Sequence, residues 1–87
     1  MASRLSLLER MKRNPAGDWT ISDVEAVCRE FEIACSPPTG GGSHFKVSDP
    51  NLPDILTIPS RRPVKPVYIR LLVRFVSAVE KARGVST

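Results

Sequence analysis

The chain has 87 residues, of which 41% are hydrophobic and 25% are charged, a composition that predicts one globular domain. No apolar run approaches the roughly 20 residues that a membrane helix needs. The N-terminus lacks the features of a signal peptide, so we expect a cytoplasmic protein without a membrane anchor. The net charge of +4 is uneven, because residues 60–87 hold seven basic side chains and one acidic one, a sum of +6. This segregation favours a polyanionic or acidic partner, although a solvated helix face is the simpler alternative.

The N-terminal part of the sequence predicts two helices. Residues 3–13 carry a short apolar stripe that is typical of a helix, and Pro15 and Gly17 in the next segment end it. We treat residues 1–19 as a helical extension. A second helix is expected to begin at Ser22, because Ser22 and Glu25 fit the capping box. Trp19, between the loop and this helix, is interpreted as a core anchor. Residues 20–87 would then form the main α-β-β-β-α domain.

Three short strands and a long helix follow. The first strand is expected at residues 33–36, the second at 43–48 and the third at 54–58, and the last helix runs from Pro66 to about residue 83 with Gly84 as its stop. In the second strand, apolar and polar residues alternate, which places His44 and Lys46 on the face opposite to the packed one. The order predicts an α+β fold in which helices cover one face of a three-stranded antiparallel sheet.

The two cysteines do not indicate a metal or redox centre. Cys28 and Cys35 lie seven residues apart, which is not the CxxC spacing, and His44 is the only histidine. Cysteine and histidine side chains alone therefore cannot complete a four-ligand zinc site. We expect two reduced structural thiols, no bound metal and no cofactor.

Three glycines lead directly into the strand that carries the histidine. Glycine amides can approach phosphate oxygens closely, Lys46 can neutralise charge, and a neutral imidazole can take a proton from a ribose 2′-hydroxyl. A lone histidine is more often structural, and the glycines alone are equally consistent with a hairpin loop. His44 is the candidate catalytic residue. The candidate RNA-binding residues are Gly42, Ser43, Lys46, Arg61, Arg62 and Lys65.

The ordered set of these segments resembles the HicA toxin family. It comprises the Ile33-Ala34-Cys35 strand, Gly41 to Val47 with its Ser-His pair, Leu56-Thr57-Ile58-Pro59, and Lys65-Pro66 at the start of the last helix. The resemblance covers about residues 22–80. It implies a fold like that of the double-stranded-RNA-binding domain and a metal-independent endoribonuclease that cleaves mRNA as the toxin of a type II toxin-antitoxin system. It also implies a HicB-like antitoxin as a partner and assigns the functional histidine of the family to His44.

Several alternatives stay open at this point. With one histidine, a Lys, Tyr, Arg or water must assist the leaving group. A non-catalytic RNA-binding module would use the same basic surface, and a protein-interaction domain would meet an acidic partner with it. The additional N-terminal helix and the long final helix are features that would also suit self-association or a modified antitoxin interface.

Overall fold

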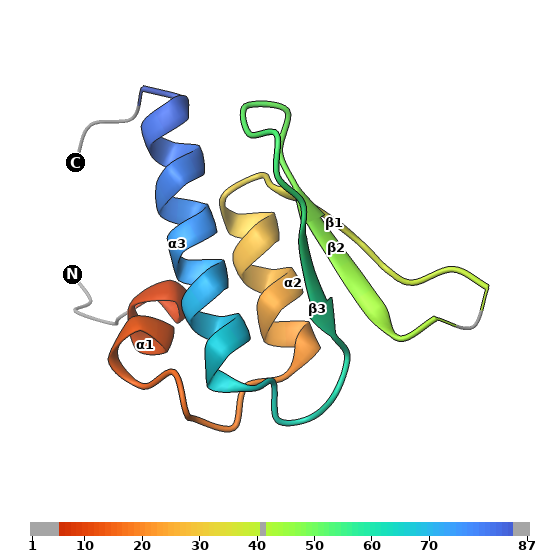
Figure 1. Ribbon diagram of the computed structural model, residues 1–87. Coiled ribbons are helices and arrows are strands. Elements are labelled where there is room, and N and C mark those ends of the chain that lie inside the picture. Colours follow the sequence, from red (N-terminus) through yellow and green to blue (C-terminus); the bar gives the residue numbers. More distant parts are fainter. Residues whose placement is uncertain (1–5, 41, 85–87) are drawn as a thin grey trace.

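The structure is a computed structural model that describes residues 6–40 and 42–84. It contains three helices and a three-stranded antiparallel sheet, so the predicted α+β class and the order of elements are confirmed (Figure 1). Gly41 of the glycine run and residues 3–5 of the expected first helix lie outside the described residues. The elements are α1 (Leu7–Arg13), α2 (Ile21–Glu30), β1 (Ala34–Ser36), β2 (His44–Ser48), β3 (Leu56–Pro59) and α3 (Pro66–Ala82).

The sheet has the order β1-β2-β3, and the helices lie on one side of it (Figure 1). Cys35 is opposite Val47 in β2, and Phe45 is opposite Ile58 in β3, which makes an apolar face toward the helices. Val47 and Ile58 are fully buried there. Because side chains alternate along a strand, the polar residues of β2 point to the other face, as predicted. The third strand begins two residues later than expected.

All three helices contribute to one hydrophobic core. The described part of the N-terminal extension supplies Leu8, Met11 and Trp19 to the same cluster as the sheet and α3, and Met11 is completely buried. Trp19 is 8% exposed, which confirms its assignment as a core residue. The amphipathic pattern of α3 is also confirmed. The buried residues of that helix are Ile69, Leu72, Phe75, Val76 and Val79.

The start of α2 differs from the prediction. The helix begins at Ile21, with Thr20 as its N-cap, and the capping box joins Thr20 to Asp23. The Thr20 hydroxyl accepts a hydrogen bond from the Asp23 amide, and the Asp23 carboxylate accepts one from the Thr20 amide at 2.9 Å. The prediction of a Ser22–Glu25 box is therefore wrong by two residues, although the type of cap is correct.

The end of α3 is fastened to the rest of the fold by Arg83. Its guanidinium donates to the carbonyls of Phe31 and Glu32, where α2 ends, and to Asp49 Oδ1 at 2.8 Å. Asp49 is 4% exposed. Burial alone would raise the pKa of this carboxyl, but hydrogen bonds from Asn51 and Arg83 together outweigh it and lower the pKa. No helix in the described part of the chain is both long enough and apolar enough to cross a membrane.

Candidate nucleic-acid interface

The free face of the sheet carries His44 and Lys46 side by side on β2. Both side chains are exposed, as the alternation of the strand predicted. Lys46 lies between Ser36 of β1 and Thr57 of β3 in the register, so a polar row crosses all three strands. Of the two faces, the helices of the described residues cover the other one (Figure 1). A ligand can therefore approach the imidazole and the ammonium group from the same direction.

His44 has one side-chain neighbour at hydrogen-bonding distance among the described residues. Its Nδ1 atom lies 3.5 Å from Ser43 Oγ, which is long for a hydrogen bond. If Nδ1 carries the proton and donates to this oxygen, Nε2 is left as the basic nitrogen facing solvent. Ser43 is fixed by its main chain, because its carbonyl accepts from the Ser60 amide at 2.8 Å.

An open hollow of about 330 Å³ lies between β2 and the loop that precedes it. Ser43, His44 and Lys46 line it together with the residues that follow β1. Gly42 is also part of the wall, but its amide donates to the Thr39 carbonyl at 3.2 Å. That N–H is therefore already bonded within the loop. Gly42 forms part of the wall of this hollow but has no free N–H to donate to a phosphate. Gly40 has a φ of 59°, which explains a glycine at that turn.

The three basic residues of the loop after β3 are not equivalent. Arg61 and Lys65 line a small hollow of about 90 Å³ with Pro59 and Tyr68. Pro59 is the cross-strand partner of His44, so this hollow adjoins the histidine end of the sheet. Arg62 instead pairs with Asp18, with Nη2 2.9 Å from Oδ2, and this hydrogen bond lowers the pKa of Asp18. Pro59 and Tyr68 also line this hollow, and neither belongs to the set of binding residues predicted from the sequence.

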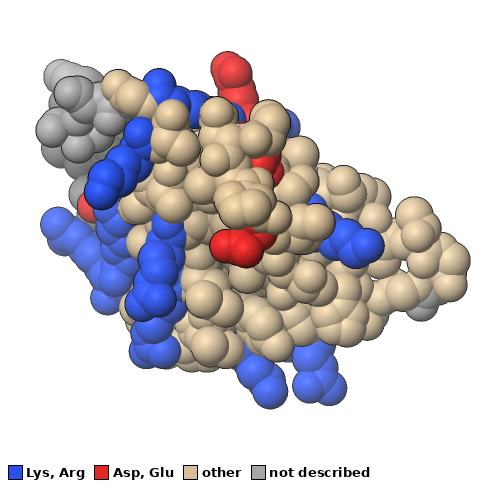
Figure 2. Space-filling view, turned by 45° about the horizontal axis from the view of Figure 1, so that its top comes forward, with Lys and Arg blue, Asp and Glu red and all other residues tan. Residues whose placement is uncertain are grey.

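Basic side chains are also abundant away from the sheet. Figure 2 shows Lys and Arg gathered along the side of the molecule on which α1 and α3 lie and at its lower edge, with few acidic side chains among them. The exposed basic residues of those two helices are Arg10, Lys12, Arg13, Arg70, Arg74 and Lys81. Within the described residues, no group of three or more His, Cys, Asp and Glu side chains is arranged to hold a metal ion.

The two cysteines are free thiols, as expected. Burial raises the pKa of Cys28 to about 12, and burial also raises the pKa of Cys35, so neither forms a reactive thiolate near neutral pH. They therefore add no chemistry to the surface described above.

Comparison of the chain with models of protein families, with curated proteins and with solved structures gave no match. The class of protein that the fold and the site define is a small α+β domain with a free polar sheet face bordered by basic residues.

Proposed function

We propose that the protein is a HicA-like toxin that binds and cleaves mRNA without a metal ion, on a fold related to the double-stranded-RNA-binding domain. The observation that carries the proposal is the exposure of His44 and Lys46, side by side, on the free face of the sheet. A histidine in that position can reach a ribose and its adjacent phosphate at the same time as a cation does. In this proposal the protein acts in the cytoplasm.

The chemistry needs one proton acceptor and one proton donor. Neutral His44 takes the proton of a ribose 2′-hydroxyl through Nε2, and the resulting oxygen attacks the neighbouring phosphorus. The bond from phosphorus to the 5′-oxygen of the next nucleotide breaks, leaving a cyclic 2′,3′-phosphate and a 5′-hydroxyl. Lys46 stabilises the charge that develops on the phosphoryl oxygens. DNA lacks the 2′-hydroxyl and is not cleaved.

The leaving 5′-oxygen must receive a proton from a second group. Lys65 and Tyr68 line the hollow behind Pro59, and Pro59 lies opposite His44 in the register. Lys65 and Tyr68 therefore lie toward the histidine end of the sheet, which makes them the candidates for this proton donor. Arg61 has no role in proton transfer, because arginine keeps its proton, but it binds the phosphate in the same hollow.

A HicB-like antitoxin fits the same surface. An acidic chain that covers the free sheet face would bury His44 and Lys46 and place carboxylates near Arg61 and Lys65. This arrangement would exclude RNA and silence the toxin through direct competition. Its expected signature is loss of RNA retention when the antitoxin is added, with recovery at a higher RNA concentration.

Cleavage by the wild type and by His44→Ala tests the proposal. Single-stranded RNA is incubated with each protein in the presence of a chelator, and both cleavage and retention are scored. Ser77→Ala, a truncation at an exposed position of α3, is the matched control. We expect cleavage with a cyclic phosphate end by wild type and Ser77→Ala, and RNA binding without cleavage by His44→Ala.

The other outcomes identify the alternatives. Equal, weak cleavage by all three proteins would be contamination and would refute the catalytic role of His44. RNA retention without any cleavage would indicate a non-catalytic RNA-binding module. No retention even at low salt, where phosphate contacts are strongest, would leave the protein-interaction domain.

A further inference from the structure

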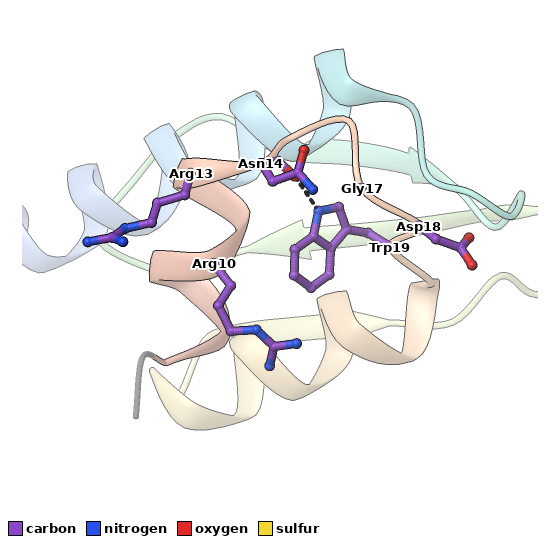
Figure 3. A pocket seen from close by; sticks show the side chains of 6 residues that line it. All are labelled: Arg10, Arg13, Asn14, Gly17, Asp18 and Trp19. Carbon is purple, nitrogen blue, oxygen red and sulfur yellow. Dashed lines mark hydrogen bonds between the residues drawn. The ribbon is translucent and has the colours of Figure 1, made fainter. Parts of the chain in front are cut away.

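A second basic surface lies at the junction of α1 and α2, apart from the histidine. An open hollow of about 430 Å³ is lined there by Arg10, Arg13, Asn14, Gly17, Asp18 and Trp19 (Figure 3). The indole forms its floor and is held in place, because Trp19 Nε1 donates to the Asn14 carbonyl at 2.8 Å. The hollow is therefore a built feature of the core and not a gap beside a mobile side chain.

The two arginines of this hollow are available for a ligand. Neither has a carboxylate partner among the described residues, whereas the neighbouring Lys12 pairs with Glu9 at 3.4 Å. The Arg10 guanidinium lies beside the indole ring, with Cζ 5.7 Å from the ring centroid. Contact with the ring limits the conformations of this guanidinium but leaves its hydrogen-bond donors unused.

Figure 3 shows that the two guanidinium groups do not converge. Arg10 extends below the ring, and Arg13 points away from it at the end of α1. A small anion would touch only one of them. Successive phosphates of an extended chain can meet both, so the arrangement fits a polyanion.

This hollow is joined to the basic loop of the proposed site. The Trp19 carbonyl accepts from the Val64 amide at 2.8 Å, and Asp18 pairs with Arg62. Both partners belong to the segment between β3 and α3, and the same segment carries Arg61 and Lys65. The Asp18 and Arg62 side chains are 64% and 68% exposed, so the ion pair is weak and Arg62 can exchange the carboxylate for a phosphate.

We infer that RNA follows one track along this edge of the molecule, from His44 and Lys46 past Arg61 and Lys65 to Arg62, Arg10 and Arg13. In Figure 1 the His44 end of β2, the loop before α3 and the loop before α2 all lie at the lower edge. The N-terminal helix thus becomes the second half of an RNA-binding surface. The inference rests on the proposed function and extends it, because it names where the RNA leaves the cleavage site.

Binding of single-stranded RNA to Arg10→Gln/Arg13→Gln tests the track. All proteins carry His44→Ala so that the RNA stays intact, and oligonucleotides of about 4 and about 16 nucleotides span the range of site sizes of small single-strand-binding folds. Losing two phosphate contacts lowers the salt slope of log K by about 1.4 on the long oligonucleotide. The ratio of the association constant of the parent to that of the double variant therefore falls about sevenfold when the salt concentration rises from about 50 to about 200 mM. The short oligonucleotide, held at the histidine end, binds both proteins equally.

Two control variants separate loss of contact from loss of structure. Arg29→Gln/Lys81→Gln removes two exposed charges on α2 and α3 and should keep the parent slope. Arg10→Lys/Arg13→Lys keeps the charges and should keep most of the slope, and melting curves monitor folding. An unchanged slope and affinity for the Gln variant overturn the track while cleavage by His44 stands. Equal loss in the Arg29→Gln/Lys81→Gln variant also overturns it, because binding would then follow net charge alone. Absence of RNA binding by the parent removes both proposals.

Discussion

Gly17 is a position outside the regular elements at which one added methyl group should destabilise the fold. A Cβ atom there would lie 3.0 Å from Trp19 Nε1 and 3.0 Å from Asn14 Nδ2. The Asn14 side chain is exposed and can turn away, but the indole is 8% exposed and bonded to the Asn14 carbonyl. Gly17→Ala therefore requires the ring, which that hydrogen bond holds, to move by a few tenths of an ångström within the core.

The net cost follows from two opposing terms. Overpacking of a filled site costs about 1–3 kcal/mol, and removing a glycine from the unfolded chain returns about 0.4–1 kcal/mol. The balance runs from about 0 to about 2.6 kcal/mol with a centre of about 1.3 kcal/mol, and that central loss lowers the melting temperature of a domain of this size by roughly 5–10 °C. Trp19 is the only tryptophan, so its native fluorescence should shift in the same variant.

A matched glycine provides the control for this experiment. At Gly42 the added Cβ would be 3.4 Å from its nearest neighbours, an ordinary contact. Gly42→Ala should therefore melt at or slightly above the wild-type temperature. If Gly17→Ala melts within about 2 °C of wild type, well under the shift that 1 kcal/mol produces, and keeps the wild-type fluorescence, the indole is not clamped as described.

Three further predictions concern stability and thiol chemistry. Thr20→Ala should cost about 1 kcal/mol of unfolding free energy, whereas Ser22→Ala should be nearly neutral in the same denaturation series, and the reverse order would contradict the observed cap. The lowered pKa of Asp49 means that its stabilisation is present above the usual value of 3.8 and is lost as pH falls through the lower folded value. Wild type should therefore lose its advantage over Asp49→Asn in acid melts, and a gap that stays constant down to the lowest pH would refute this linkage. At pH near 8, iodoacetamide should leave Cys28 unmodified in the native protein and modify it after unfolding, while rapid native labelling would show that the thiol is not buried.

The sequence predicts best those parts of the fold in which apolar residues recur at the spacing of a helix or a strand. Burial along α3 follows the helical repeat from Ile69 to Val79, and the alternation in β2 identifies which of its side chains face solvent. The cap of α2 shows the limit of such local rules. Thr20–Asp23 and Ser22–Glu25 are overlapping pairs of the same type, and the sequence alone does not choose between them. The tertiary position of Trp19, buried and bonded through its carbonyl to Val64, fixes the chain just before Thr20 and favours the earlier cap.

The sequence gives the number of basic residues near the candidate site, but it does not indicate which of them form ion pairs in the fold. The seven basic residues of the C-terminal segment look equally available in the sequence, yet the fold pairs Arg62 with Asp18 and Arg83 with Asp49. Those partners lie 44 and 34 residues away, so no local pattern indicates them. The same reason explains why the hollow beside Trp19 was missed. Its arginines are three residues apart on one helix, but only the folded loop brings the indole into the same hollow.

The loop that carries Arg61 and Lys65 is held in place by the core. Val64, between them, is 1% exposed, and its amide donates to the Trp19 carbonyl. On the other side of the site, Gly42 and Ser43 are exposed and lie outside the core, but main-chain hydrogen bonds to Thr39 and Ser60 hold them as well. Ordering a side chain or a loop on binding costs free energy, and the buried anchor at Val64 lowers that cost for the basic loop. In the proposed ribonuclease, the basic loop therefore meets the RNA with its main chain already in place.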